Sequence, residues 1–169
     1  MKRHLALICL ALFLCAPQTL RAAVFRNNFV SFELPPGWNC NQEDTEWVCQ
    51  SALQAEKKRS IIVLAAKLRG KQDSLAQYQD YLSHPKRYTS VDGKPITSKV
   101  LSTRSVTITN QEWIVSVHDS SEIPGFATKY YATIKDDIAV LITYSVVMSD
   151  LESEGKVLDD MMRSLRILR

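Results

Sequence analysis

The chain has 169 residues, of which 46% are hydrophobic and 23% charged, with 21 Lys and Arg against 18 Asp and Glu. Three of the basic residues, Lys2, Arg3 and Arg21, lie within the first 22 positions, so the rest of the chain carries equal numbers of both signs. Nucleic-acid binding needs a surplus of basic side chains facing phosphates. The balanced charge therefore argues against a nucleic-acid partner.

Residues 1–22 are predicted to be a signal peptide. A basic start precedes an apolar run, Leu5–Leu14, and small residues follow at Ala22 and Ala23. The apolar run is about half of the roughly 20 residues that a membrane helix needs, and no later segment resembles a transmembrane span. We therefore expect cleavage near Ala22, a periplasmic or secreted product, and one domain formed by residues 23–169.

The first strand of the mature chain is predicted where Val30, Phe32 and Leu34 alternate with polar residues. Two prolines and Gly37 follow, which indicates a turn. A later run, Ile61–Ala66, is almost wholly apolar and β-branched at its start. Such a run predicts a central strand that is covered on both sides.

The stretch "WNCNQEDTEWVC" is predicted to be a hairpin in which Cys40 faces Cys49 and Glu43–Glu46 form a four-residue loop. Zinc is disfavoured because His84 and His118 lack the spacing of a zinc motif. Thiol exchange is disfavoured because redox pairs lie two residues apart at a helix start. We interpret the pair as a structural disulfide of an exported protein and expect no metal or cofactor.

The tip of this hairpin is acidic. Glu43, Asp44 and Glu46 could supply oxygen ligands to a hard divalent cation, but they lack the spacing and the glycine of a calcium loop. A solvated turn is the favoured interpretation, and cation binding is left open.

Two helices are predicted. Ser74 and Gln77 have the spacing of a capping box, and Leu75 to Leu82 follow before Pro85 ends the helix. Ser149 and Glu152 suggest a second capping box near the C-terminus. Gly155 weakens the start of that helix by about 1 kcal/mol, so its firm part is expected only after this residue. The apolar side chains expected to face the sheet are Leu151, Leu158, Met162 and Leu165.

Alternating runs predict two antiparallel hairpins. The first joins 100–108 to 113–117 through a turn at 109–111, and the second joins 129–134 to 138–144 through Asp136 and Asp137. Hairpins together with two helices predict an α+β domain, a twisted antiparallel sheet with helices packed on its faces.

Candidate chemistry is sparse. His118, Asp119, Ser120 and Ser121 lie together, but the partners of a catalytic triad normally come from separate elements, and no G-x-S-x-G motif occurs. We therefore expect no catalytic residue.

Two neighbouring tyrosines, Tyr130 and Tyr131, are candidate partner-contact residues. Strand alternation sends them to opposite faces, so one is expected in the core and the other against solvent or a partner.

Two segments, "FVSFELPPGW" (Phe29–Trp38) and "IAVLITYSVVMSDLESEGKVLDDMMRSLRI" (Ile138–Ile167), give the chain a resemblance to the PsbP/Mog family of α/β/α sandwiches. The resemblance implies a twisted antiparallel sheet between helices and a non-enzymatic role as an accessory or binding module. It carries no functional residue over to this chain.

The leading hypothesis is an exported, non-enzymatic accessory domain that binds another protein or a component of the cell envelope. Two alternatives are a hydrolase that uses His118 and a carrier of a small apolar ligand or lipid between sheet and helix. The carrier requires an internal cavity.

Overall fold

The computed structural model describes residues 23–53, 55, 59–89, 93–121 and 123–168. The predicted signal peptide, residues 1–22, lies outside the described residues. Within the described ranges, no helix has both the length and the apolar composition that crossing a bilayer requires.

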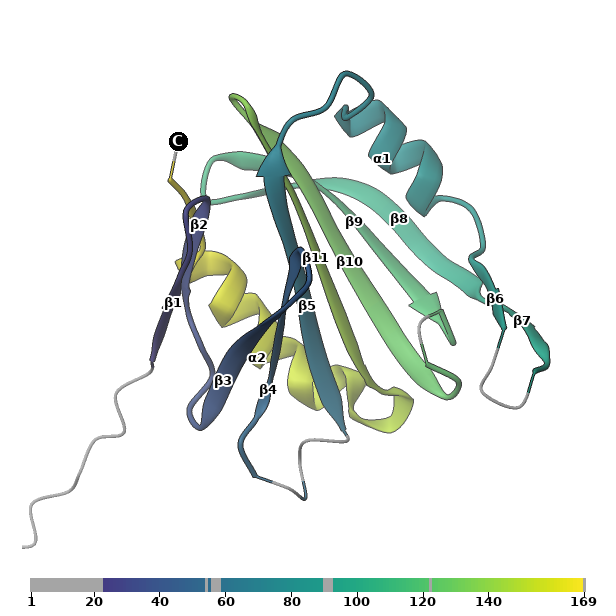
Figure 1. Cartoon of the computed structure of the whole chain (residues 1–169). Helices are drawn as coiled ribbons and strands as arrows, with labels where there is room; N and C mark the ends of the chain where they lie inside the picture. Colours follow the sequence, from purple (N-terminus) through teal and green to yellow (C-terminus); the bar gives the residue numbers. More distant parts are fainter. Residues whose placement is uncertain (1–22, 54, 56–58, 90–92, 122, 169) are drawn as a thin grey trace, which may run out of the picture.

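A seven-stranded antiparallel sheet forms the centre of the molecule (Figure 1). Its strands, from one edge to the other, are β3 (Trp38–Glu43), β4 (Glu46–Ser51), β5 (Ser60–Leu68), β11 (Ile138–Val147), β10 (Phe126–Lys135), β9 (Gln111–Asp119) and β8 (Lys99–Ile108).

Smaller elements surround this sheet. A second sheet is made of β1 (Val24–Arg26), β2 (Val30–Glu33) and β12 (Arg166–Ile167), and a third of β6 (Arg87–Thr89) and β7 (Pro95–Thr97). The helices are α1 (Leu75–Leu82), the 3-10 turn η1 (Met148–Asp150) and α2 (Leu151–Ser164).

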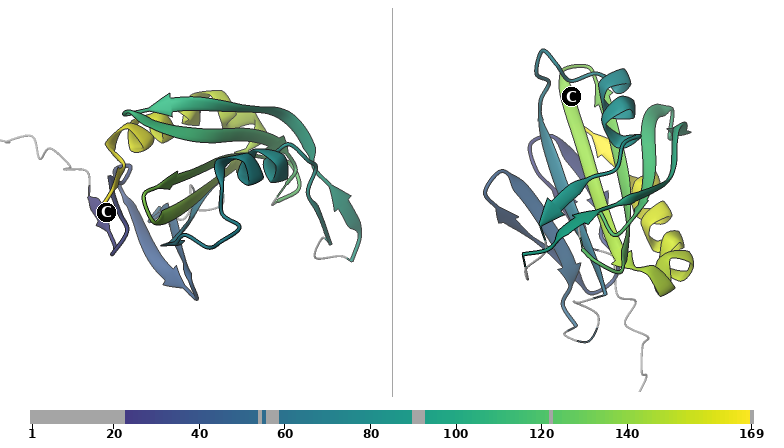
Figure 2. Two further views of the ribbon diagram at one scale, coloured as in Figure 1. Left: turned by 90° about the horizontal axis from the view of Figure 1, so that it is seen from above. Right: turned by 90° about the vertical axis from the view of Figure 1, so that its right-hand side faces the viewer.

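The two α-helices pack on opposite faces of the seven-stranded sheet. Residues of α2 join the larger core, which includes Trp113 and Tyr131, whereas Leu82 of α1 joins a smaller core with Ile114 and Tyr130. Seen from above, the sheet curves around α1 (Figure 2, left). This is the α+β architecture that the alternating runs predicted.

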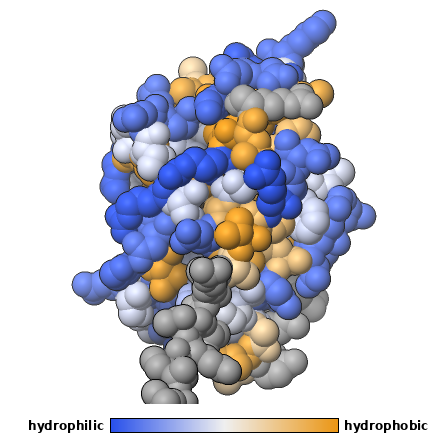
Figure 3. Space-filling view, turned by 90° about the vertical axis from the view of Figure 1, so that its left-hand side faces the viewer, coloured by the Kyte–Doolittle hydropathy of each residue, from blue (hydrophilic) through white to orange (hydrophobic). Residues whose placement is uncertain are grey.

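On the side of the molecule that carries β1, polar side chains separate the apolar ones into patches (Figure 3). Val24 of β1 is among the exposed apolar residues, with 66% of its surface accessible. Scattered apolar side chains of this kind are ordinary on a protein surface and do not by themselves indicate a binding site.

Several sequence predictions are confirmed. Both long hairpins form, with turns at Thr109–Asn110 and Asp136–Asp137, and Cys40 lies opposite Cys49 in the ladder of β3 and β4. The Ser74 hydroxyl accepts a hydrogen bond from the backbone N–H of Gln77 at 3.2 Å, which is the predicted N-cap of α1.

Other predictions are wrong. The loop at Glu43–Glu46 is shorter than expected, because Glu43 and Glu46 pair in the ladder and leave Asp44 and Thr45 as the turn. Asp44 adopts the left-handed conformation (φ 51°) that so tight a turn needs. The run at Ile61–Ala66 is interior to the sheet, but only one of its faces is fully buried.

The start of α2 also differs from the prediction. Ser149 lies in the preceding 3-10 turn and donates to the Asp150 carboxylate, so it does not cap the helix with Glu152. The helix begins at Leu151 and continues through Gly155 without interruption. Packing of Leu158, with Met161 and Met162, against the sheet overrides the weak propensity of the glycine.

Candidate binding sites

His118 of β9 is fully buried and belongs to a hydrogen-bonded network beneath α1. Its Nε2 lies 2.9 Å from the carbonyl oxygen of Leu82, the last residue of α1, and its Nδ1 lies 3.2 Å from Oγ of Ser98. A carbonyl oxygen can only accept a hydrogen bond. Nε2 of His118 is therefore the protonated ring nitrogen, and its N–H donates the hydrogen bond to the Leu82 carbonyl.

This geometry gives His118 a structural role. The hydroxyl of Ser116 also donates to the Leu82 carbonyl, at 2.9 Å, so two side chains of β9 hold the C-terminal end of α1. Because no surface of the ring is accessible, a substrate has no approach to it in this structure. The hydrolase alternative therefore lacks the accessible histidine that it requires.

Cys40 and Cys49 form a disulfide across β3 and β4. Cys49 is fully buried and faces the larger core, while β3 is an edge strand that pairs only with β4. Closing a loop of about ten residues stabilises the folded state by about 2.5–3 kcal/mol in the chain-entropy model. The bond therefore holds an edge strand in place.

The acidic hairpin tip does not gather ligands. Among the residues that the structure describes, no three His, Cys, Asp or Glu side chains lie close enough together to hold a metal ion, and Glu43, Asp44 and Glu46 are included in that set.

Tyr130 and Tyr131 point to opposite faces of the sheet, but neither faces solvent. Tyr130 is 4% exposed and its hydroxyl lies 2.5 Å from Oγ of Ser121, whereas Tyr131 is 2% exposed beneath α2. Burial raises the pKa of Tyr131, and the nearby Asp159 carboxylate raises it further. The expectation that one ring is solvent-facing is wrong, because each sheet face carries a helix at this point.

The first candidate binding surface is a groove of about 430 Å³ beside α1, which we call the α1 groove. Helix α1 packs on β8, β9 and β10, so the same face of β5 and β11 is left without a helix (Figure 1). Apolar side chains line it from the sheet, from α1 and from the loop before β10: Ile61, Val63, Leu141, Tyr81, Leu82, Tyr130 and Ile123.

Charged side chains of both signs stand at the rim of the α1 groove. Glu46 lies at the start of β4, and the ammonium of Lys86 lies 3.0 Å from the centre of the Tyr81 ring. Tyr81 and Ile123 are 61% and 36% exposed and lie among the other side chains that line the groove rather than singly. An apolar floor with exposed aromatic and aliphatic side chains and a charged rim is typical of a protein-binding surface.

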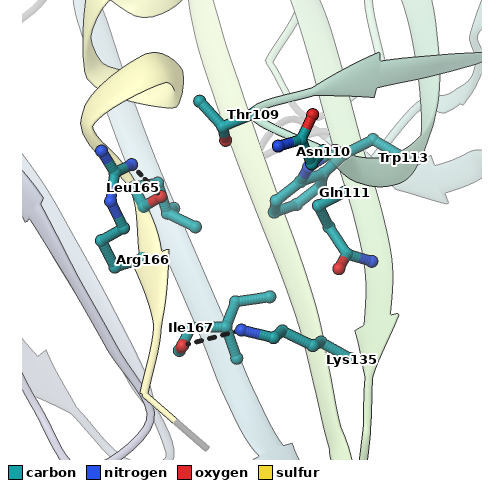
Figure 4. Close-up of a pocket in the computed structure, with 8 residues that line it drawn as sticks. All are labelled: Thr109, Asn110, Gln111, Trp113, Lys135, Leu165, Arg166 and Ile167. Atoms are coloured by element: carbon teal, nitrogen blue, oxygen red, sulfur yellow. Dashed lines mark hydrogen bonds between the residues drawn. The ribbon is translucent and has the colours of Figure 1, made fainter.

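The second candidate surface is a pocket of about 500 Å³ on the opposite face, which we call the C-terminal pocket (Figure 4). Its floor is made of the buried side chains Trp113, Leu165 and Ile167. Its rim comes from the β8–β9 turn, from the end of β10 and from β12: Thr109, Asn110, Gln111, Lys135 and Arg166.

Sequence reasoning missed both surfaces as such, although one candidate partner-contact residue, Tyr130, lines the α1 groove. The α1 groove depends on how far α1 extends across the sheet. The C-terminal pocket depends on β12, a two-residue strand that no sequence pattern predicts. The available sequence signal was the turn predicted at 109–111, since Thr109 and Asn110 of that turn, with φ angles of 46° and 63°, line the rim of the C-terminal pocket.

No family model matches the chain, and no curated protein matches its sequence. Solved structures do match, and they show that the chain has the fold of the PsbP/Mog-like α+β sandwiches. One is cyanobacterial PsbP (CyanoP) from Synechocystis, with 8% identity, a TM-score of 0.63, and coverage of 90% of this chain and 96% of that one.

Two further structures have the same fold. The Ran-binding protein Mog1p of Saccharomyces cerevisiae is 12% identical with a TM-score of 0.52, covering 82% of this chain and 90% of that one. LpqN of Mycobacterium tuberculosis, involved in cell envelope biogenesis, is 10% identical with a TM-score of 0.55, covering 82% of each chain. At these identities the likeness establishes the fold alone.

Proposed function

We propose that the chain is an exported, non-enzymatic accessory domain that binds another protein, or a protein component of the cell envelope, through the α1 groove. The observation that carries this proposal is the mainly apolar groove over β5 and β11, which α1 leaves without a helix and at whose edges Tyr81 and Ile123 are exposed. Burying such a face would be favourable by about 25 cal/mol for each Å² removed from water.

The structural neighbours support the same kind of role. Mog1p is described as Ran-binding and LpqN as involved in cell envelope biogenesis. The disulfide between Cys40 and Cys49 supports export, because such bonds persist in oxidising compartments. Export itself is tested by the intact mass of the processed protein, which should begin at Ala23 and carry no reactive thiol.

Site-specific photo-crosslinking in cells of the source organism tests the binding surface. A photoreactive amino acid replaces Ile123 in the groove or, as the matched control, Val157 on α2, since both native side chains are 36% exposed. We expect a discrete adduct from position 123 and none from position 157, because only the first faces the proposed partner. Mass spectrometry then identifies the partner.

The identified partner is purified and titrated with the full exported chain. Ile123→Ser should weaken binding by about 10- to 150-fold, since a buried aliphatic side chain contributes about 1.5–3 kcal/mol, and Val157→Ser should leave the affinity unchanged. Equal adducts from both positions, or equal affinity of both variants, would remove the groove from the proposal.

A further inference from the structure

The C-terminal pocket contains a hydrogen-bond donor without a protein acceptor. Trp113 is 2% exposed, and its indole N–H makes no hydrogen bond with the residues that the structure describes. Within the same residues every buried side-chain nitrogen or oxygen has a partner. The indole nitrogen therefore keeps some solvent-accessible surface, and Trp113 is one of the residues that line the pocket.

Two cations share this pocket. The Lys135 ammonium donates to the carbonyl oxygen of Ile167 at 3.4 Å, a long hydrogen bond that leaves two of its three hydrogens unused (Figure 4). Nη1 of Arg166 donates to the carbonyl oxygens of Arg163 and Leu165, each at 2.9 Å, which leaves Nε and Nη2. Among the described residues, neither cation forms an ion pair with a carboxylate.

The floor of the pocket is apolar, and Thr109, Asn110 and Gln111 add polar groups at its rim. Figure 4 shows the Trp113 ring turned from β9 toward the side of Leu165, with Ile167 below it. A volume of about 500 Å³ lies within the range of small-molecule sites, which are mostly apolar with a few convergent polar groups. The polar groups with unused capacity here are an N–H donor and two cations, so the complementary ligand is an acceptor and an anion with an apolar body.

We propose that the C-terminal pocket binds a small apolar monocarboxylate. The carboxylate accepts a hydrogen bond from the Trp113 indole and is neutralised by Lys135, with Arg166 on the other side of the pocket. The apolar body lies on Trp113, Leu165 and Ile167. This site is on the opposite face of the sheet from the α1 groove and does not depend on the function proposed for that groove.

The test titrates sodium octanoate into the full exported chain labelled with ¹⁵N, and follows the indole N–H resonances of Trp38, Trp47 and Trp113. We expect only the Trp113 resonance to move, and to move saturably. Trp113→Phe assigns this resonance. If that variant does not fold, Trp38→Phe and Trp47→Phe assign it by elimination.

Neutral and charged controls define the ligand class. Octanamide has the same chain without the charge and should bind about tenfold more weakly, because a charge-assisted hydrogen bond is roughly twice as strong as a neutral one. Inorganic phosphate has charge without an apolar body, so it should not produce a saturable shift of the Trp113 resonance. Equal shifts with octanamide or with phosphate, or no shift with octanoate, would overturn the proposal.

A matched pair of lysine variants tests the residues. Lys135→Gln should raise the Kd for octanoate about tenfold. Lys156→Gln, which removes the same charge from an 80% exposed position on α2, should leave the Kd unchanged. Equal effects of the two variants would mean that net charge, rather than the pocket, attracts the anion.

Discussion

At the scale of single residues, His118 shows how a group with catalytic potential serves as an anchor. Its ring packs edge-on against Tyr130, with the two ring centres 5.1 Å apart, and its nitrogens are hydrogen-bonded to Ser98 and to the end of α1. Replacing His118 would leave the buried Leu82 carbonyl oxygen with fewer hydrogen-bond donors, which lowers the free energy of unfolding.

His118→Ala should therefore lower the free energy of unfolding by about 2–4 kcal/mol, measured by urea denaturation. Ser98→Ala, which removes only the partner of Nδ1, should cost about 1 kcal/mol and serves as the graded control. Unchanged stability of the histidine variant would contradict the anchoring role and would make a chemical role worth testing again.

The start of α1 depends on a polar cluster around Asp73. Its carboxylate accepts from the Tyr78 hydroxyl at 3.0 Å, from the Gly70 N–H at 2.7 Å, and from Lys67 at 3.1 Å. Burial raises the pKa of Asp73, but these three donors outweigh it and hold the pKa below the usual 3.8. For Tyr78, burial and the Asp73 carboxylate both raise the pKa from 10.0 to about 12.

This shift predicts a pH dependence of stability. A raised pKa in the folded state means that the Tyr78 contribution is fully present below pH 10.0 and is lost as the pH rises toward about 12. Tyr78→Phe should therefore lower the free energy of unfolding near neutral pH. The difference in this free energy between the variant and the wild type should shrink as the pH rises from 10.0 toward about 12. Urea denaturation at a series of pH values measures this. A difference that stays constant with pH would contradict the interpretation.

At the scale of elements, α2 shows tertiary packing overriding local propensity. The helix buries Leu158, Met161 and Met162 against the larger core while keeping Gly155 in its second turn. A β-carbon added at Gly155 would have no neighbouring atom within 4 Å, and the backbone there is not in the left-handed region.

Gly155→Ala should therefore stabilise the protein by about 0.5–1 kcal/mol, because alanine restricts the unfolded chain and introduces no clash. Thermal unfolding measures the shift. Gly37→Ala is the opposing control: Gly37 has a φ of +78°, so a side chain there is strained and should destabilise. Equal effects of the two substitutions would contradict the argument.

At the scale of the whole molecule, the sheet separates two surfaces of different chemistry. The α1 groove is apolar with a mixed charged rim, and the C-terminal pocket combines an apolar floor with two cations. Because successive strand residues point to opposite faces, the neighbouring residues Trp113 and Ile114 belong to the cores on opposite faces of the sheet.

The two surfaces should therefore be independent. Ile123→Ser should weaken binding of the protein partner without changing the octanoate titration, and Lys135→Gln should do the reverse, because residues far apart with no shared partners act additively. Performing both measurements on both variants checks this. Coupled losses would indicate a rearrangement of the sheet between the two faces.

The sequence alone determined the features that arise from local pattern. Alternation of apolar residues placed the two long hairpins, the two cysteines set the register of β3 with β4, and Ser74 with Gln77 set the start of α1. These features depend on residues close together in the chain, where the period of the backbone decides which side chains share a face.

Only the tertiary structure decided what is buried and what is open. His118, Tyr130 and Tyr131 were ambiguous in sequence because exposure depends on which helix covers each face, and that cover comes from residues distant in the chain. The α1 groove exists because an eight-residue helix is too short to cover a seven-stranded sheet, and the C-terminal pocket exists because β12 returns to β2 beside Trp113. Neither depends on local propensity, so neither could be predicted from pattern.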